Sequence, residues 1–465
     1  MDGAARIDEV VTALLAQFAE RCSLNRDVRD RHGRGESWHP SQAPDAVVFP
    51  SSTEDVSDIV RLCAANGVAV IPFGAGTSLE GQVQAVDGGV CIDLSQMSGI
   101  VAVHSEDLDC TIQPGVTREQ LNTHLRDTGL FFPIDPGAEC TIGGMVATRA
   151  SGTNAVRYGT MRENVLGLTV VMADGSVIKA GGRARKSAAG YDLTRLFVGS
   201  EGTLGIVTEI TLRLHGIPEA TAAAVAAFPT IDAAVDTVIQ VIQTGVPIAR
   251  IELMDDVSIG AVNTYAGLTL DEVPTLFLEF HGSSASVQEQ AETVELLAKE
   301  NGCAGFVWSD RAEDRAQLWQ ARHNAYYAGL ALKPNAIGLV TDVCVPISRL
   351  AECIRETKTD LASCPMPAPL LGHVGDGNFH VCFIMDPDSP EQIAEAERLH
   401  HRMVGRALAM GGTCTGEHGI GLGKRDFLVD EAGDGVAVMA RIKHALDPNY
   451  ILNPGKMFNA RDRSA

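Results

Sequence analysis

Four glycine-rich stretches constrain this chain more than any other feature of its sequence. Glycine loses more conformational freedom on folding than any other residue, so clusters of it favour places where the backbone turns sharply or approaches a ligand closely. One such stretch alone is equally consistent with a structural turn. Four of them, each at the end of an expected strand or helix, favour a long ligand with a diphosphate and flat rings. The stretches are residues 71–78, 135–144, 150–154 and 199–206.

The first stretch contains Gly74 and Gly76 after an apolar strand, as a dinucleotide-binding turn does. A Rossmann unit also needs a helix directly after this turn and then a second strand. Too few residues separate Ser78 from the next expected strand at 90–94 for such a helix, so we exclude a Rossmann unit. The loop can still present successive backbone N–H groups and two hydroxyls to a phosphate, as an anion-binding nest does.

Composition excludes several classes of protein. The chain has 37 Lys and Arg against 59 Asp and Glu, and a net charge of −22 argues against nucleic acid as a partner. No apolar run is long enough for a transmembrane segment, and the N-terminus lacks the pattern of a signal or transit peptide. The eleven cysteines include no Cys-x-x-Cys pair, which favours reduced thiols. We therefore expect a cytoplasmic protein.

The periodicity of apolar residues predicts an α+β fold with two styles of organisation. From about 40 to 215, short strands alternate with helices, and an amphipathic helix precedes them. From about 220 to 365, longer strands alternate with long helices, which predicts an antiparallel sheet covered on one face by helices. The expected strands of this second part are 222–228, 247–253, 275–282 and 339–346, and its expected helices are 230–243, 285–300, 311–330 and 348–362.

A second group of residues has the chemistry of a metal site. His373 and His380 flank a segment in which glycines alternate with Asp376 and Asn378, a pattern that indicates a turn or bulge able to bring both imidazoles to one point. Two imidazoles with the carboxylate of Glu417 form a ligand set for a divalent ion such as Zn²⁺ or Mn²⁺. The alternative is that they are hydrogen-bonded core histidines and a solvated carboxylate.

The order of these motifs resembles a known family. The motifs are IPFGAGTS, IQPGV, DPGAECTIGG, SGTNAVRYGTMRENV, RKSAAGYDLTRLFVGSEGTLGIVTE, GHVGDGNFH and GGTCTGEHGIGLGK. They resemble the flavoproteins of the vanillyl-alcohol oxidase and p-cresol methylhydroxylase superfamily, and within it the branch of cytochrome-type D-lactate dehydrogenases and glycolate oxidase flavin subunits. The resemblance implies a two-subdomain FAD-binding domain at 1–217, a cap domain with the substrate and metal site at 218–424, and a C-terminal segment, 425–465, that returns to the FAD domain.

The resemblance also implies which residues bind the flavin. Some relatives attach FAD covalently through a histidine in the first glycine loop; this loop has none, so we expect noncovalent FAD. The diphosphate is expected at the first glycine loop, and the rest of the flavin along the later stretches. The expected residues are Pro72, Gly74, Ala75, Gly76, Thr77, Ser78, Pro136, Gly137, Thr141, Gly143, Gly144, Ser151, Gly152, Ile206 and Asn378.

With these residues, the resemblance implies oxidation of a 2-hydroxy acid. The substrate hydroxyl would bind the metal ion at His373, His380 and Glu417, which lowers the pKa of that hydroxyl. His418 would take its proton as general base, and the Cα hydride would pass to flavin N5. The resemblance places an arginine in this part of the cap, so Arg322 is expected to bind the substrate carboxylate as a fork of donors, with a surface arginine as the alternative.

The resemblance favours D-lactate among several substrates. Related 2-hydroxyglutarate dehydrogenases carry a Lys where Val340 stands here, so one carboxylate and a small or apolar tail are expected. A D-2-hydroxyglutarate or glycolate dehydrogenase, a flavin subunit active only in a complex, and a metal-dependent hydrolase with a nucleotide ligand are the alternatives.

The chain shows no cysteine pattern of an iron–sulfur cluster or a c-type haem. Electrons are therefore expected to leave for an external cytochrome, quinone or electron-transfer flavoprotein. Homodimerisation, and peripheral association with an inner membrane through the acceptor, stay open.

Overall fold

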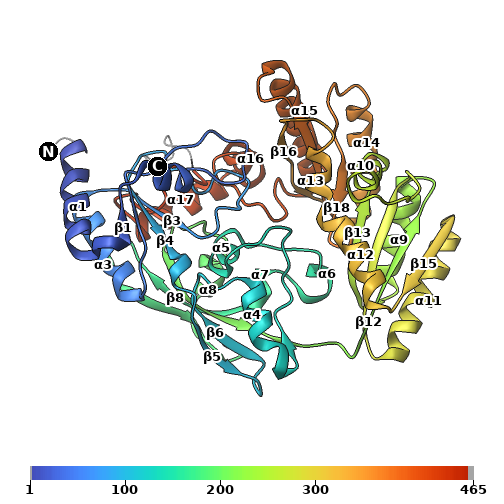
Figure 1. Ribbon diagram of the computed structural model, residues 1–465, viewed down its shortest axis with the longest axis horizontal. Coiled ribbons are helices and arrows are strands. Elements are labelled where there is room, and N and C mark those ends of the chain that lie inside the picture. The colour runs from blue at the N-terminus through green and yellow to red at the C-terminus, as the bar shows by residue number, and fades with distance from the viewer. Residues whose placement is uncertain (1–2, 459–465) are drawn as a thin grey trace. The chain divides into compact units, whose positions relative to one another are not determined.

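The structure, a computed structural model, describes residues 3–458 (Figure 1). Its contacts divide the chain into two compact units. Unit 2 takes up Gly152–Tyr158 and Pro218–Gly416, and unit 1 takes up the rest. The sequence prediction placed the return to the first domain at residue 425, whereas the chain returns at Glu417. The prediction also kept Gly152 in the first domain, whereas the segment around it joins unit 2.

Unit 1 contains a small mixed sheet near the N-terminus. Its strands lie in the order β1-β2-β4-β3, and β2, β4 and β3 run parallel. The helix that connects β2 to β3 begins because the Ser52 hydroxyl accepts a hydrogen bond from the Asp55 N–H, and it ends at Gly67 in the left-handed region. These elements are α1 (Gly3–Phe18), β1 (Cys22–Ser23), β2 (Ala46–Val48), α3 (Thr53–Asn66), β3 (Val70–Phe73) and β4 (Val90–Asp93).

A second sheet of unit 1 has five antiparallel strands in the order β5-β6-β10-β8-β9. One large apolar cluster connects this sheet to helices α4 and α5. The elements are β5 (Ile100–His104), β6 (Asp109–Ile112), α4 (Arg118–Leu125), α5 (Ile142–Thr148), β8 (Val165–Val171), β9 (Val177–Gly181) and β10 (Ile206–Arg213).

The C-terminal segment of unit 1 is attached to both sheets. Its helices are α16 (Arg425–Ala432) and α17 (Gly435–Leu446). The fully buried Lys443 donates hydrogen bonds from Nζ to the carbonyl oxygens of Thr203, at 2.7 Å, and Leu452, at 2.9 Å. Leu452 in turn forms a parallel bridge with Val70 of β3. The segment thereby completes the edge of the first sheet.

Unit 2 is built on an antiparallel sheet, as the sequence predicts. The strand order is β15-β12-β14-β13-β18-β19-β16, and β17 pairs with β19. Every described pairing in it is antiparallel. The strands are β12 (Ala220–Ala227), β13 (Ile248–Met254), β14 (Thr275–Gly282), β15 (Gly305–Ser309), β16 (Ile337–Val340), β17 (Val343–Cys344), β18 (Leu370–Gly372) and β19 (Asn378–Met385).

The helices of unit 2 form two packed groups beside this sheet (Figure 1). In one group α9 contacts α11 and α14, and α14 contacts α15; in the other, α10, α12 and α13 contact one another. The helices are α9 (Ile231–Gln243), α10 (Asp256–Ala266), α11 (Ser284–Glu300), α12 (Ala312–His323), α13 (Ala325–Leu330), α14 (Leu350–Leu361) and α15 (Pro390–Ala409).

Two predicted elements of unit 2 are interrupted. The helix expected at 311–330 is divided at Asn324, and the strand expected at 339–346 is divided at Thr341 and Asp342. The Thr341 hydroxyl accepts a hydrogen bond from the Val381 N–H, and the Asp342 carboxylate accepts one from Asn378. These tertiary hydrogen bonds compete with a continuous strand, and an apolar pattern alone does not reveal them.

Within residues 3–458, no helix is both long enough and apolar enough to cross a membrane.

Candidate functional site

The first glycine loop follows β3 in unit 1 and is packed tightly against a later one. A Cβ atom added at Gly74 would lie 2.3 Å from Oγ1 of Thr141, so only glycine fits there. Gly76 has a φ of +72°, in the left-handed region that favours glycine. The Thr141 hydroxyl also accepts a hydrogen bond from the Gly144 N–H. The first two glycine stretches, which are separate in the sequence, therefore form one cradle.

Ser78 shows that this cradle suits an anion. Its Oγ is buried and has no hydrogen-bond partner among residues 3–458. A buried hydroxyl without a partner is costly, and native proteins rarely leave one so. A phosphate oxygen at this place would satisfy it. The residues of the cradle therefore fit the diphosphate that the sequence predicts.

The fourth glycine stretch connects unit 1 to its own C-terminal segment. Glu201 lies at φ +52° and is buried. Its carboxylate accepts hydrogen bonds from the N–H groups of Ile420, at 2.7 Å, and Gly421, at 2.8 Å. Burial raises the pKa of this carboxyl to about 7. The side chain of Ile206, at the start of β10, is packed in the apolar core of the first sheet. The flavin contact expected of Ile206 would therefore use its backbone.

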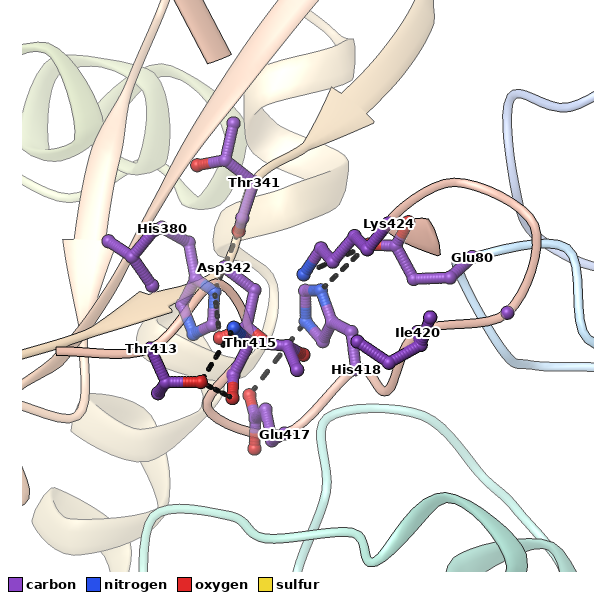
Figure 2. Close-up of polar contacts among 12 residues, drawn as sticks. Glu80, Thr341, Asp342, His380, Thr413, Thr415, Glu417, His418, Ile420 and Lys424 are labelled. Carbon is purple, nitrogen blue, oxygen red and sulfur yellow. Dashed lines mark hydrogen bonds and ion pairs between the residues drawn. The ribbon is translucent and has the colours of Figure 1, made fainter. Parts of the chain in front are cut away.

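The two histidines of the predicted metal site come together within unit 2. His373 follows β18 and His380 lies on β19, and the turn between them brings their ring centroids to 5.5 Å. Nδ1 of His380 lies 2.9 Å from the carbonyl oxygen of Thr341 (Figure 2). Nδ1 of His373 lies 2.7 Å from Oε1 of Glu252. Because a carbonyl and a carboxylate oxygen only accept, each ring must carry its proton on Nδ1. In a neutral ring the lone pair then lies at Nε2. A metal-binding histidine commonly has this arrangement, with its other ring nitrogen hydrogen-bonded.

The sequence analysis missed Glu252, which lies on β13 and is fully buried. Oε2 of Glu252 accepts hydrogen bonds from Nε of Arg322, at 3.0 Å, and from Nη2, at 2.6 Å. Burial alone raises the pKa of the Glu252 carboxyl, but its interactions with His373 and Arg322 outweigh burial, and the pKa lies below its usual value. The signal that could have found Glu252 is a carboxylate among the mostly apolar residues of a strand.

Arg322 is not a surface residue, because its exposed fraction is 7 %. Its bonds to Glu252 use Nε–H and one N–H of Nη2, so an added carboxylate would meet the N–H groups of Nη1 and the second N–H of Nη2. The helix α12 thus holds the guanidinium beside the same carboxylate that holds His373.

Asn378 has a structural position in the same turn. Its Nδ2 donates to Oδ1 of Asp342, at 2.7 Å, and to the carbonyl oxygen of Val343, at 2.8 Å. The other carboxylate oxygen of Asp342 accepts a hydrogen bond from the Thr415 hydroxyl at 2.7 Å (Figure 2). The segment that leads to Glu417 is thereby anchored at the strand that carries His380, up to Gly416, the last residue of unit 2.

Glu417 and His418 begin the last part of unit 1, in a loop packed on the segment after the first glycine loop. Nδ1 of His418 lies 3.9 Å from Oε1 of Glu80, and its Nε2 lies 3.9 Å from Oε1 of Glu417 (Figure 2). The fully buried Lys424 lies with Nζ 3.2 Å from the same oxygen of Glu80. Glu80 and Lys424 were not predicted from the sequence.

Comparison with protein families gives two matches. Residues 44–181 match a family model described as FAD binding domain. Residues 217–457 match a model described as FAD linked oxidases, C-terminal domain.

Named relatives match over nearly the whole chain. One, from Danio rerio, is named "Probable D-lactate dehydrogenase, mitochondrial"; it is 52% identical over 97% of this chain and 92% of its own. Another, from Arabidopsis thaliana, is named "D-lactate dehydrogenase [cytochrome], mitochondrial"; it is 47% identical over 97% of this chain and 80% of its own. Both names contain the word mitochondrial, so they do not support the predicted cytoplasmic location.

A solved structure of p-cresol methylhydroxylase has the same fold. The TM-score is 0.78 at 16% identity, over 97% of each chain. At this identity the likeness concerns the fold alone, and it confirms the predicted fold class.

Proposed function

The chain belongs to the FAD-linked oxidase family, and on this premise we propose that it is an FAD-dependent dehydrogenase of small D-2-hydroxy acids. D-lactate is the first proposed substrate and the 2-oxo acid is the product. The observation that carries the proposal is the pair His373 and His380, in which Nδ1 of each ring contacts an acceptor. Arg322 is paired with Glu252, the acceptor that contacts His373. The names of the similar chains supply the substrate class.

FAD would be held noncovalently along the glycine stretches of unit 1. Ser78 and the backbone of Gly74–Thr77 would bind the diphosphate, since the buried Ser78 hydroxyl can donate a hydrogen bond to a phosphate oxygen. The remaining predicted residues would line the rings. Bound FAD supplies the two-electron acceptor for the hydride. Because the first loop contains no histidine, acid precipitation of the protein should release the flavin into solution.

A divalent ion, Zn²⁺ or Mn²⁺, would be held by Nε2 of His373, Nε2 of His380 and the carboxylate of Glu417. Such an ion lowers the pKa of a hydroxyl bound to it. His418, the next residue in the chain, would take the hydroxyl proton while the Cα hydrogen leaves as hydride. The hydroxyl and the Cα–H bond thereby become the carbonyl of the 2-oxo acid, with one proton on His418 and two electrons on the flavin.

Arg322 would bind the substrate carboxylate through Nη1 and the second N–H of Nη2. Val340 at the end of β16 leaves no cation at the place where the 2-hydroxyglutarate dehydrogenases carry a Lys. Lactate, 2-hydroxybutyrate and longer aliphatic homologues therefore fit better than a substrate with two carboxylates.

The proposal is tested by adding substrates to the FAD-loaded protein under anaerobic conditions. We expect D-lactate to bleach the yellow flavin band and to yield pyruvate, and L-lactate to leave the band unchanged. If D-2-hydroxyglutarate or glycolate bleached the flavin band faster than D-lactate, that compound would be assigned as the substrate instead. Protein that is colourless and cannot be reconstituted with FAD would favour the metal-dependent hydrolase instead.

Reduced flavin would be reoxidised by an external cytochrome, quinone or electron-transfer flavoprotein. Activity of the lone chain with an artificial dye acceptor would exclude a need for a partner subunit. All described cysteines are free thiols, which fits any compartment that keeps thiols reduced. Homodimerisation is tested by the mass of the protein in solution.

A further inference from the structure

Glu252 is an unusual residue for its position. It lies near the middle of β13, opposite Phe277 of β14, and its side chain is fully buried. Its neighbours in the strand, Ile251 and Leu253, are apolar and equally buried. An ionised carboxylate in such surroundings is strongly destabilising unless it is paired and hydrogen-bonded. The contacts of the Glu252 carboxylate must therefore compensate for the cost of burying it.

Each carboxylate oxygen of Glu252 serves a different partner. Oε1 lies 2.7 Å from Nδ1 of His373, and Oε2 accepts two hydrogen bonds from the Arg322 guanidinium at 3.0 and 2.6 Å. The histidine follows β18 and the arginine lies on α12, so the two partners come from elements far apart in the sequence. All three residues belong to unit 2. One planar group thus fixes two side chains in a single geometry.

The contact with His373 determines which ring nitrogen carries the proton. A carboxylate can only accept, so Nδ1 must donate and the lone pair must lie at Nε2. Carboxylates that hold a metal-binding histidine in this way orient the ring and make it a stronger ligand. The contact with Arg322 likewise holds Nε and Nη2 and directs the remaining nitrogen, Nη1, away from Glu252.

We propose that Glu252 is a positioning residue that orients His373 for the metal ion and Arg322 for the substrate carboxylate at the same time. The inference rests on the proposed function, because it assigns His373 and Arg322 the roles given there. Glu252 itself touches neither metal nor substrate. Its part is to couple the two binding events through one buried carboxylate.

The decisive variant is Glu252→Gln. Glutamine keeps the size of the side chain but has one acceptor oxygen and one amide donor, so it cannot accept from both partners. If the oxygen stays with Arg322, the amide meets Nδ1 of His373 and forces the proton onto Nε2. We expect the affinity of the FAD-loaded, chelator-treated protein for Zn²⁺ to fall about 10- to 100-fold, the range for a lost partner behind a metal ligand. The KM for D-lactate should rise as well.

Glu279→Gln is the matched control. Glu279 lies on the adjacent strand β14, is also buried, and also holds a histidine, since its Oε1 lies 2.7 Å from Nε2 of His281. Among the described hydrogen bonds and ion pairs, none joins Glu279 to His373 or to Arg322. The control should therefore keep the Zn²⁺ affinity of the wild-type protein. Flavin absorbance and circular dichroism show whether each variant is folded.

A second variant, Glu252→Asp, keeps the inference testable if the glutamine variant does not fold. Aspartate retains both acceptor oxygens but is one methylene shorter, so we expect a Zn²⁺ affinity between those of wild type and Glu252→Gln. Wild-type affinity in folded Glu252→Gln or Glu252→Asp protein would overturn the positioning role alone. Wild-type protein that binds FAD but no Zn²⁺ would overturn the metal site of the proposed function together with it.

Discussion

At the scale of single residues, close packing decides which glycines of this chain are replaceable. Gly74 is one that is not replaceable, because the hydroxyl of Thr141 occupies the space of any side chain. Since the same threonine caps α5, it cannot move without loosening that helix. The requirement for glycine is therefore imposed by a second loop and not by the backbone angle of the first.

Gly74→Ala should weaken FAD binding and lower the free energy of unfolding by about 1–3 kcal/mol, the usual range for overpacking. Its Cβ would lie 2.3 Å from Oγ1 of Thr141, so the cradle must open. Fluorescence titration of apo-protein with FAD and urea denaturation measure the two effects. Gly182→Ala is the control, because a Cβ there meets nothing within 4 Å. Equal FAD affinity in the two variants would contradict the role of the cradle.

His418→Ala tests the base at the same scale. We expect FAD to remain bound while the rate of flavin reduction by D-lactate falls by about a hundredfold or more, the usual scale for a lost acid–base group. Stopped-flow absorbance of the flavin under anaerobic conditions measures this rate. The exposed His401 on α15 supplies a control, since His401→Ala removes an imidazole elsewhere. Near-normal reduction in His418→Ala protein would remove His418 from the role of base.

At the scale of elements, the C-terminal segment is held in unit 1 by buried charged groups. Glu201 accepts from the backbone at Ile420 and Gly421, Lys443 donates to Thr203, and Lys456 donates to carbonyl oxygens at Gln84 and Pro454. Lys456 is almost fully buried and hydrogen-bonded to neutral acceptors. Burial lowers the pKa of its ammonium group to about 7, although the charges of Asp87 and Glu201 oppose this effect.

The lowered pKa of Lys456 predicts a pH dependence of stability. Below pH 7 the ammonium is charged in both the folded and the unfolded chain, and the burial penalty is fully present. Between about 7 and the ordinary value of 10.5, the folded chain has lost the proton that the unfolded chain still binds. The free energy of unfolding therefore rises with pH in this window, by at most about 1.4 kcal/mol per pH unit from this group.

Urea denaturation of wild type and Lys456→Met at several pH values above 7 measures this contribution. The wild type should gain stability relative to the variant as the pH rises, because methionine has no proton to lose. Lys179→Met, at an exposed position of β9, should show no such relative change. A constant difference between wild type and Lys456→Met across the window would contradict the lowered pKa.

At the scale of the whole molecule, the chain is divided between two units with separate apolar cores. The residues expected to hold FAD lie mainly in unit 1, whereas the two histidines and Arg322 lie in unit 2. Ligands that bind only a folded state stabilise it by mass action. The flavin should therefore protect unit 1 directly.

Calorimetry of apo-protein with increasing FAD tests this expectation. At a free concentration of 100 times the Kd, FAD should add about 2.7 kcal/mol to the free energy of unfolding of the part that binds it. The midpoint temperature of that transition should rise with FAD concentration. Gly74→Ala protein should need more FAD for the same rise. A midpoint that does not depend on FAD would show that the glycine cradle is not its site.

Local patterns predicted much of this molecule. The helix after Ser52 and its end at Gly67 follow from a capping side chain and a left-handed glycine, both within one turn of the helix. The glycines between His373 and His380 predicted a turn that folds the two imidazoles together, and the ring centroids lie 5.5 Å apart. These features depend on interactions between residues close in sequence, and the residue types alone reveal them.

Only the tertiary structure decided the rest. The order β15-β12-β14-β13-β18-β19-β16 brings Glu252, His373 and Arg322 together from three distant segments, and the return of the chain at Glu417 places His418 beside Glu80. A carboxylate among the mostly apolar residues of a strand shows in the sequence as an anomaly, but its partners do not. Strand order and long-range packing depend on the free energy of the whole fold, and no short window of sequence contains that sum.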